Sequence, residues 1–396
     1  MTSVPFVFRG AWARLRYARA RLLLGISGVG TSVLIAASTL SLDLPRRLLS
    51  TDARQPWWAA LSSIALVLAY TIVAFACFDL LGGAMFVRRV VQPGVWLRSW
   101  GRVVIAQWVI WMLCAAGILV GFRQFGIAGS FGCFVAAQLL LAGLRGRLSR
   151  IVAAMPVVPP TPLLLAAARD AGISADALVV VECADEGFVG GWAGIRARVL
   201  VVPARWSSLP MAVVVAQLAR RRAIATSGAH WRGVIGAVLW NCLGFVLVVF
   251  RIEPALATAA GIVTLSAGMT LWAFLGVLLL PTISRCAVYV ADRDAAGIVG
   301  APAVCAAIVA LDQWQDDEPT RSSIVETIFH PVPGRASRIK QLTSPSSTHR
   351  IAWMLPQAHH LARHALWLNW AALTPISRAV HCNVGRPALW VMLPGD

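Results

Sequence analysis

The chain has 396 residues, of which 58% are hydrophobic and 13% are charged, and its mean hydropathy is +0.73. This composition excludes a purely soluble protein and indicates an integral membrane protein. The formal net charge of +18 comes almost wholly from arginines that flank apolar runs, so we expect contact with anionic lipid headgroups and no nucleic-acid partner.

About six apolar runs approach or exceed the roughly 18 to 20 residues that a helix needs to cross a bilayer. The runs are 22–42, 59–83, 103–122, 125–144, 233–250 and 255–281. Arginine clusters lie between the second and third runs and after the fourth. By the positive-inside rule, both termini and the central segment are expected in the cytoplasm. The preference for arginine over lysine, with abundant alanine and glycine, suggests a GC-rich bacterial genome, so the expected location is the bacterial cytoplasmic membrane.

The composition changes at MPVVPPTP, where prolines precede a less apolar region. Thr161, Pro162 and Gly172 predict the cap, first residue and end of a short helix, TPLLLAAARDAGI. ALVVVECA and ARVLVVPARW are expected to form strands around the glycine-rich turn FVGGWAGI, and the segment from Val213 is expected to form the next helix.

The expected organisation has five parts. A membrane region (1–150) precedes a first cytoplasmic segment (151–232), a transmembrane hairpin (233–281), a second cytoplasmic segment (282–342) and a basic, tryptophan-rich interfacial tail (343–396).

Four segments, in order, resemble those of the M48 family of integral-membrane zinc metallopeptidases, which includes HtpX-like and Ste24-like proteins. CADEGFVGGWAGIRARVLVVP resembles the turn and strand before that family's active-site helix, and ARWSSLPMAVVVAQLARRRAIATSGAH resembles the helix itself. AVYVADRDAAGIVG resembles the later helix with its Glu-x-x-Ala-Asp pattern, and HPVPGRASRI resembles the family's His-Pro segment. The resemblance implies a mainly α polytopic membrane protein with about six transmembrane helices and a small α+β zincin-like cytoplasmic domain.

The family's zinc chemistry uses two histidines one helical turn apart, a glutamate as general base and a third ligand from a distant helix. The matching positions here hold Ala216 and Arg220 for the histidines, Gln217 for the base and Val288 for the third ligand. None of these side chains can bind zinc or hold the proton. Asp292 alone is retained; in the family it supports the active-site helix, and here it could pair with Arg220 or Arg293.

The resemblance together with these four substitutions therefore implies a pseudopeptidase, with no hydrolytic activity and no cofactor expected. Its groove, at Gly190, Gly191 and Gly194, would bind membrane or misfolded polypeptides, or the protein would bind a partner protease. One alternative is an active zinc metalloendopeptidase with relocated ligands, for which His360 and His364, spaced i and i+4, are the visible candidates. Another is a transporter or channel component, which the scarcity of polar residues in the spans disfavours.

Overall fold

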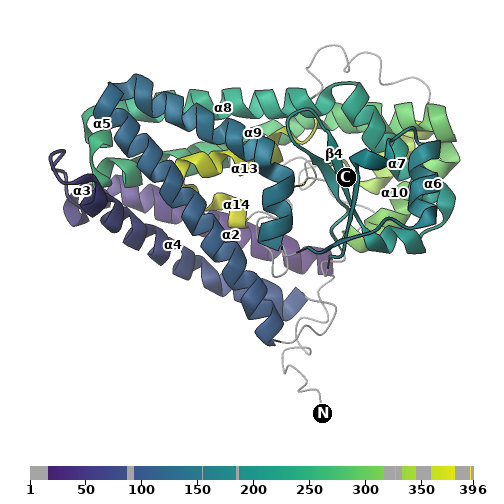
Figure 1. The fold of residues 1–396 in the computed structure, drawn as a ribbon, viewed down its shortest axis with the longest axis horizontal. Helices are drawn as coiled ribbons and strands as arrows, with labels where there is room; N and C mark the ends of the chain where they lie inside the picture. Colours follow the sequence, from purple (N-terminus) through teal and green to yellow (C-terminus); the bar gives the residue numbers. More distant parts are fainter. Residues whose placement is uncertain are drawn as a thin grey trace.

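The structure is a computed structural model that describes residues 17–86, 93–153, 155–183, 187–315, 326, 332–344, 358–379 and 393. These residues are mainly helical, with one small mixed sheet (Figure 1). Five helices are long and apolar enough to cross a membrane, which indicates an integral membrane protein. They are α2 (Tyr17–Ser41), α4 (Trp57–Phe86), α5 (Pro93–Ala153), α8 (Ala229–Ile252) and α9 (Ala259–Val299).

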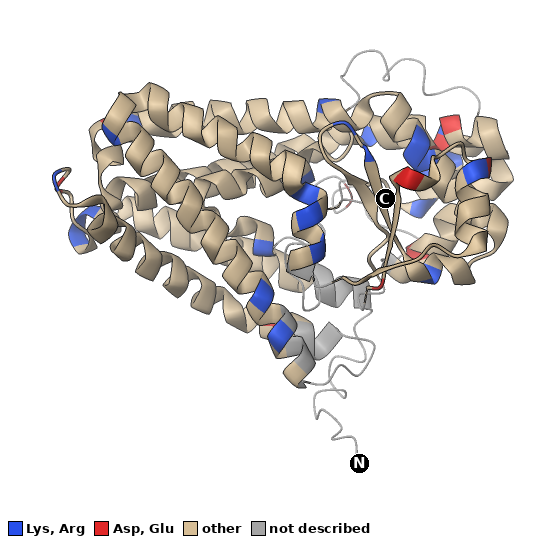
Figure 2. Ribbon diagram, viewed as in Figure 1, with Lys and Arg blue, Asp and Glu red and all other residues tan. Residues whose placement is uncertain are grey.

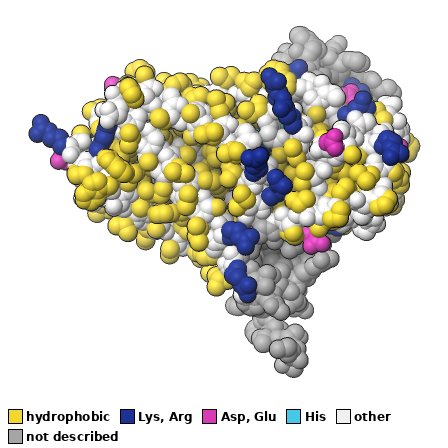
Figure 3. Space-filling view, viewed as in Figure 1, with side chains coloured by type: hydrophobic (Ala, Val, Ile, Leu, Met, Phe, Trp, Pro, Cys, Tyr) yellow, Lys and Arg dark blue, Asp and Glu magenta, His cyan; other side chains and the backbone are white. Residues whose placement is uncertain are grey.

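The surface of the helix bundle is apolar. Leu66 and Tyr70 on α4, Leu113 on α5 and Phe250 on α8 are between 69% and 81% exposed. Figure 3 shows hydrophobic side chains over much of the visible side of the bundle, with Lys and Arg side chains along its border with the sheet-bearing end and others at the opposite end. An exposed apolar belt bounded by cations is the surface that a lipid bilayer covers.

Helix α5 contains two of the predicted spans, because it turns sharply at Gly126. That glycine has φ 63° and ψ −148°, which interrupts the helix. Two pairs, Gly117 with Cys133 and Gly121 with Gly129, then face each other across the turn; a Cβ on Gly129 would overlap the carbonyl oxygen of Gly121. The helix is therefore an antiparallel hairpin whose two arms approach closely through small residues.

Helix α9 joins the bundle to a head, by which we mean the sheet with helices α6, α7, α10 and α12. Its 41 residues extend about 60 Å, roughly twice the hydrocarbon thickness of a bilayer. It contacts α2 and α8 of the bundle as well as α7, α10 and α12 of the head. Pro281 lies near the midpoint. The helix thus runs on from the predicted span 255–281 into the segment expected to begin at 282.

The head contains a four-stranded sheet of order β1-β2-β4-β3, in which only the β2–β4 pair is parallel. The register pairs Val180 with Val202 and Trp192 with Leu200. Its strands are β1 (Val157–Val158), β2 (Leu178–Val181), β3 (Gly191–Ala193) and β4 (Val199–Pro203). Its helices are α6 (Pro162–Asp170), α7 (Met211–Thr226), α10 (Ala301–Gln315) and α12 (Arg335–Thr343).

The two faces of the sheet have different neighbours. Val180, Leu200 and Val202 pack with α6, α7 and α10 in one hydrophobic cluster. Val181 and Val201, on the other face, pack with Phe188, Met155 and Leu393. The predicted cap of α6 is confirmed, since the hydroxyl of Thr161 accepts a hydrogen bond from the amide of Leu164. Short connecting elements are α3 (Leu44–Leu48), η1 (Ala175–Ala177), η2 (Ala204–Ser208) and η3 (Glu253–Ala257).

The C-terminal segment 358–379 differs from its expected place in an interfacial tail. It forms α13 (Leu361–Leu368), η4 (Asn369–Ala372) and α14 (Ile376–Ala379). Every residue from 358 to 378 is buried. The segment contacts all five long helices and lies among them in Figure 1. Its tryptophans, histidines and arginines suggest an interface by composition, but they pack against the inner faces of the spans instead.

Candidate functional site

The positions that the sequence matched to a zinc site do meet in space, where α7 packs against the head half of α9. Ala216, Gln217, Arg220, Val288 and Asp292 are each at most 1% exposed. Ala216 belongs to the hydrophobic cluster between the sheet and the helices. With alanine and valine at two of these positions, this part of the site offers no donor atom to a ligand.

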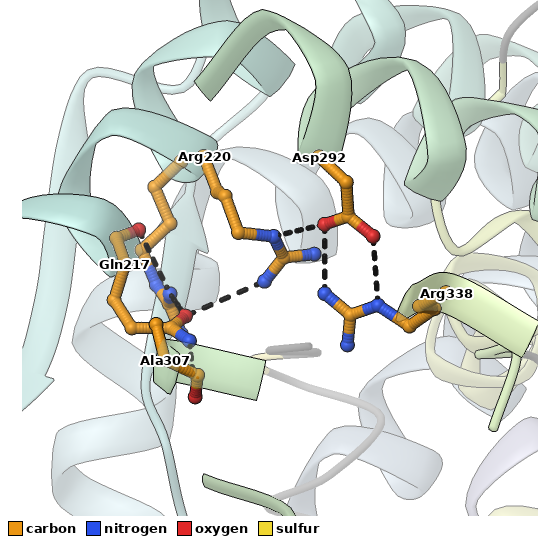
Figure 4. Close-up of polar contacts among 6 residues, drawn as sticks. Gln217, Arg220, Asp292, Ala307 and Arg338 are labelled. Carbon is orange, nitrogen blue, oxygen red and sulfur yellow. Dashed lines mark hydrogen bonds and ion pairs between the residues drawn. The ribbon is translucent and has the colours of Figure 1, made fainter. Parts of the chain in front are cut away.

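A three-membered ion cluster occupies the polar side of the site. Arg220 Nε donates to Asp292 Oδ1, and Arg338 of α12 donates from Nε to Oδ2 and from Nη2 to Oδ1, both at 2.8 Å (Figure 4). The Asp292 carboxylate therefore lies between two guanidinium groups. A carboxylate with such partners is held as an anion, and the bidentate geometry fixes α12 against α9.

Gln217 is fixed by hydrogen bonds at both ends of its amide. Its Nε2 donates to the carbonyl of Ala307 on α10 at 3.0 Å. Its Oε1 accepts from Arg220 Nη1 at 3.3 Å and from Arg221 Nη1 at 2.9 Å (Figure 4). The amide thus links α7 to α10, and its oxygen faces two cations. It has no basic atom with which to take a proton from water.

Arg221 extends from α7 to the chain just before β3. Its Nη2 donates to the carbonyl of Val189 at 2.8 Å, and its guanidinium lies 4.5 Å from the ring centroid of Trp206. In return, Trp192 Nε1 of β3 donates to the Arg221 carbonyl at 2.6 Å. These contacts attach the end strand of the sheet to the helix that carries the site.

The three predicted groove glycines surround β3. Gly190 has φ 75°, and a Cβ there would overlap the carbonyl of Val201, so the close approach of two strands requires glycine. Gly191 begins β3, and Gly194, with φ 81°, follows its end. No other strand in the described part of the chain pairs with the outer edge of β3. Gly190 and Gly191 are themselves buried, whereas Gly194 is partly exposed.

The histidines proposed as relocated ligands lie in the bundle, away from this cluster. His364 Nδ1 accepts a hydrogen bond from Arg145 Nη1 at 2.6 Å. His360 precedes α13 with φ 51°, and its ring lies beside that of His359. His230 Nε2 donates to the carbonyl of Gly194 at 2.7 Å. Among the residues the structure describes, no three His, Cys, Asp or Glu side chains are arranged to hold a metal ion.

Several residues of the site were not predicted from the sequence. Arg338, on α12, is the second partner of Asp292; the sequence offered Arg220, which is confirmed, and Arg293, which is exposed. Cys305 on α10 lies near the same carboxylate, and burial together with the negative charge of Asp292 raises the pKa of its thiol. The thiol is therefore held in its protonated, unreactive form.

No protein-family model matches the chain, and no curated protein matches its sequence.

Proposed function

We propose that this chain is a non-catalytic, M48-peptidase-like membrane protein that binds polypeptides. The observation that carries the proposal is the buried Arg220–Asp292–Arg338 cluster, which lies where the resemblance would require a zinc ion and its ligands. A guanidinium stays protonated at any accessible pH. In the interior of a protein it therefore repels a divalent cation strongly.

The same arrangement argues against hydrolysis without a metal. The neighbours of Asp292 are two guanidinium groups, so its carboxylate has little basicity. The side chain of Gln217 is hydrogen-bonded to the carbonyl of Ala307 and to two arginine side chains. An amide is not basic enough to take a proton from water. A pseudopeptidase keeps the fold and loses the chemistry, and each of the four altered positions supports that conclusion.

Polypeptide binding is supported by the position of β3. This strand ends the sheet, lies beside α7, and is followed by the exposed residues Arg196 and Arg198. Gly191, Trp192 and Ala193 are themselves buried and α5 contacts the strand, so an extended segment would reach this edge from the exposed residues that follow it and add through backbone hydrogen bonds. The polypeptide would be a membrane or misfolded protein, or a partner protease.

The proposed setting is the bacterial cytoplasmic membrane with the head in the cytoplasm. Arg98 and Arg102, at the start of α5, and Arg147, near its end, converge at the head side because α5 is a hairpin. Figure 2 shows basic residues at this border. Anionic headgroups would contact this surface, and the positive-inside rule would place it in the cytoplasm.

The two alternatives gain less support. A relocated zinc site at His360 and His364 would place the metal beside Arg145, whose guanidinium already occupies His364 Nδ1. A transporter would use polar groups inside the bundle as a pathway. Those groups, including Asp79 and Asn241, instead contact the segment 358–379.

Photocrosslinking tests the polypeptide-binding proposal. A photoreactive amino acid would replace Arg196, just after β3, in the full-length protein within membranes, and a matched control would replace exposed Arg169 on α6. We expect polypeptide adducts at position 196 in clear excess over position 169. Equal or absent adducts in a correctly folded protein would contradict the proposal.

A further inference from the structure

The centre of the helix bundle is filled by a segment that is unusually polar for a membrane interior. Segment 358–379 follows all five long helices in the sequence, yet it contacts every one of them. Between 358 and 378 every residue is buried, and the polar and charged ones are at most 6% exposed. Those are His359, His360, Arg363, His364, Asn369, Thr374, Ser377 and Arg378.

The inner faces of the spans supply polar groups that match this segment. Arg378 pairs with Asp79 of α4 and donates from Nη1 to Gln107 Oε1 of α5 at 2.6 Å. Trp100 Nε1 also donates to Asp79 Oδ2, at 2.9 Å. Asp79, an acidic residue inside a span, is thus paired with an arginine. Its arginine comes from the far end of the chain.

Other contacts recognise the backbone of the segment. Asn241 Nδ2 of α8 donates to the carbonyl of Ala365 at 3.0 Å, and Ser266 Oγ of α9 donates to that of Leu373 at 3.0 Å. Hydrogen bonds to main-chain carbonyls depend little on the side chains of the segment. Such contacts are typical of sites that bind an extended or irregular polypeptide.

Helix α8 is also shaped to admit the segment. A Cβ at Gly233 would overlap the carbonyl oxygen of His359, and a Cβ at Gly236 would lie 3.0 Å from Leu361 Cδ1. The segment itself changes from an α-helix to a 3₁₀ turn and reaches φ 63° at Leu373. Irregular backbone at membrane depth is stable only where protein surrounds it, and the bundle provides that surrounding.

We propose that the centre of the bundle is a binding site for an arginine-bearing amphipathic polypeptide segment, and that residues 358–379 are its resident, tethered ligand. Asp79 and Gln107 bind the arginine, while Asn241 and Ser266 bind backbone carbonyls. The resident segment closes the site to other polypeptides. This inference rests on the proposed polypeptide-binding function and adds a second site, separate from β3.

Weakening the resident ligand while leaving the lining intact tests the inference. The full-length protein in lipid nanodiscs would carry Arg378→Ala, which removes the anchor from the segment and leaves Asp79 in place. The probe is a synthetic peptide of sequence 358–379 with a photoreactive group. A second peptide has alanine in place of its arginine equivalent to Arg378. Arg222→Ala, an exposed change in the head, is the matched protein control.

We expect little labelling of the wild type and of Arg222→Ala. Labelling of Arg378→Ala should be at least about tenfold stronger and should map to α4, α5 or α8, because an unpaired buried carboxylate favours a new cation. It should be lost with the alanine peptide and in the Asp79→Asn/Arg378→Ala double variant.

Three results would overturn the inference. The first is a folded Arg378→Ala protein without increased labelling, and the second is labelling that does not depend on Asp79. The third is failure to fold of both Arg378→Ala and Arg378→Lys, which would make the segment an inseparable part of the core. Adducts at position 196 report on β3 independently, so these failures are distinguishable from failure of the proposed function.

Discussion

The guanidinium of Arg220 on α7 is paired with the carboxylate of Asp292 on α9, and their side chains are 0% and 1% exposed. The two residues are 72 positions apart in the sequence, and their pairing joins two helices. Because both groups are out of contact with water, neither can lose its partner without a large cost in free energy. The pair therefore fixes α7 against α9 in the head.

Asp292→Asn should strongly destabilise the head. The change leaves Arg220 and Arg338 facing each other without the carboxylate that separates their charges, and loss of a buried ion-pair partner costs about 3 to 5 kcal/mol. Arg293→Ala, the next residue on α9 but exposed, should change the free energy of unfolding by about 0.5 kcal/mol or less. Unfolding curves of the two purified variants in the same detergent measure the difference. Equal stability would contradict a structural role for the ion cluster.

The stability of the α5 hairpin should depend on the glycine at position 129 and not on the glycine at position 132. Gly129→Ala places a methyl group against the backbone of Gly121 and should cost about 1 to 3 kcal/mol through overpacking. Gly132, on the same arm, has open space where a Cβ would lie, so Gly132→Ala should be neutral or stabilise by about 1 kcal/mol. Thermal unfolding of both variants tests the close approach of the arms; a loss of stability in Gly132→Ala equal to that in Gly129→Ala would refute it.

Arg221→Lys should loosen the chain around β3. Lysine cannot reproduce the planar guanidinium contacts with Gln217, Val189 and the Trp206 ring. We expect faster amide hydrogen exchange over 187–193 than in the wild type. Arg222→Lys, at the exposed neighbouring position, is the control and should leave that exchange unchanged. Unaltered exchange in Arg221→Lys would show that the strand is held by other contacts.

A designed zinc site tests the resemblance directly. The combined variant Ala216→His, Gln217→Glu, Arg220→His and Val288→Glu restores the ligands and base that the family pattern requires. Because α7 and α9 already bring these positions together, we expect about one zinc per molecule in the combined variant. Arg220→His alone should bind none, since it supplies a single ligand. Absence of zinc in a folded combined variant would contradict the zincin-like geometry.

Local sequence patterns predict much of the fold. Hydropathy indicates the apolar helices, because a span depends on its own length and composition. The predicted run at 59–83 lies within α4, and the runs at 103–122 and 125–144 are the two arms of α5. The cap at Thr161 and the φ of 69° at Gly172 likewise follow from local chemistry.

Long-range partners explain what the sequence could not predict. Arg338 looks like one of many basic residues until α12 packs against α9. The burial of 358–379 depends on Asp79, Gln107 and Asn241, which lie in three different spans. A local pattern of tryptophan, histidine and arginine fits a membrane interface as well as it fits a buried segment. Only the tertiary contacts distinguish the two placements.

The most direct test of a metal-free site is the zinc content of the detergent-purified wild-type protein and of its His359→Ala/His360→Ala/His364→Ala variant. We predict far less than one zinc per molecule in both, because a buried guanidinium occupies the site. About one zinc per molecule in the wild type would contradict the pseudopeptidase proposal. Loss of that zinc from the triple variant would then assign the metal to the histidines of the C-terminal segment.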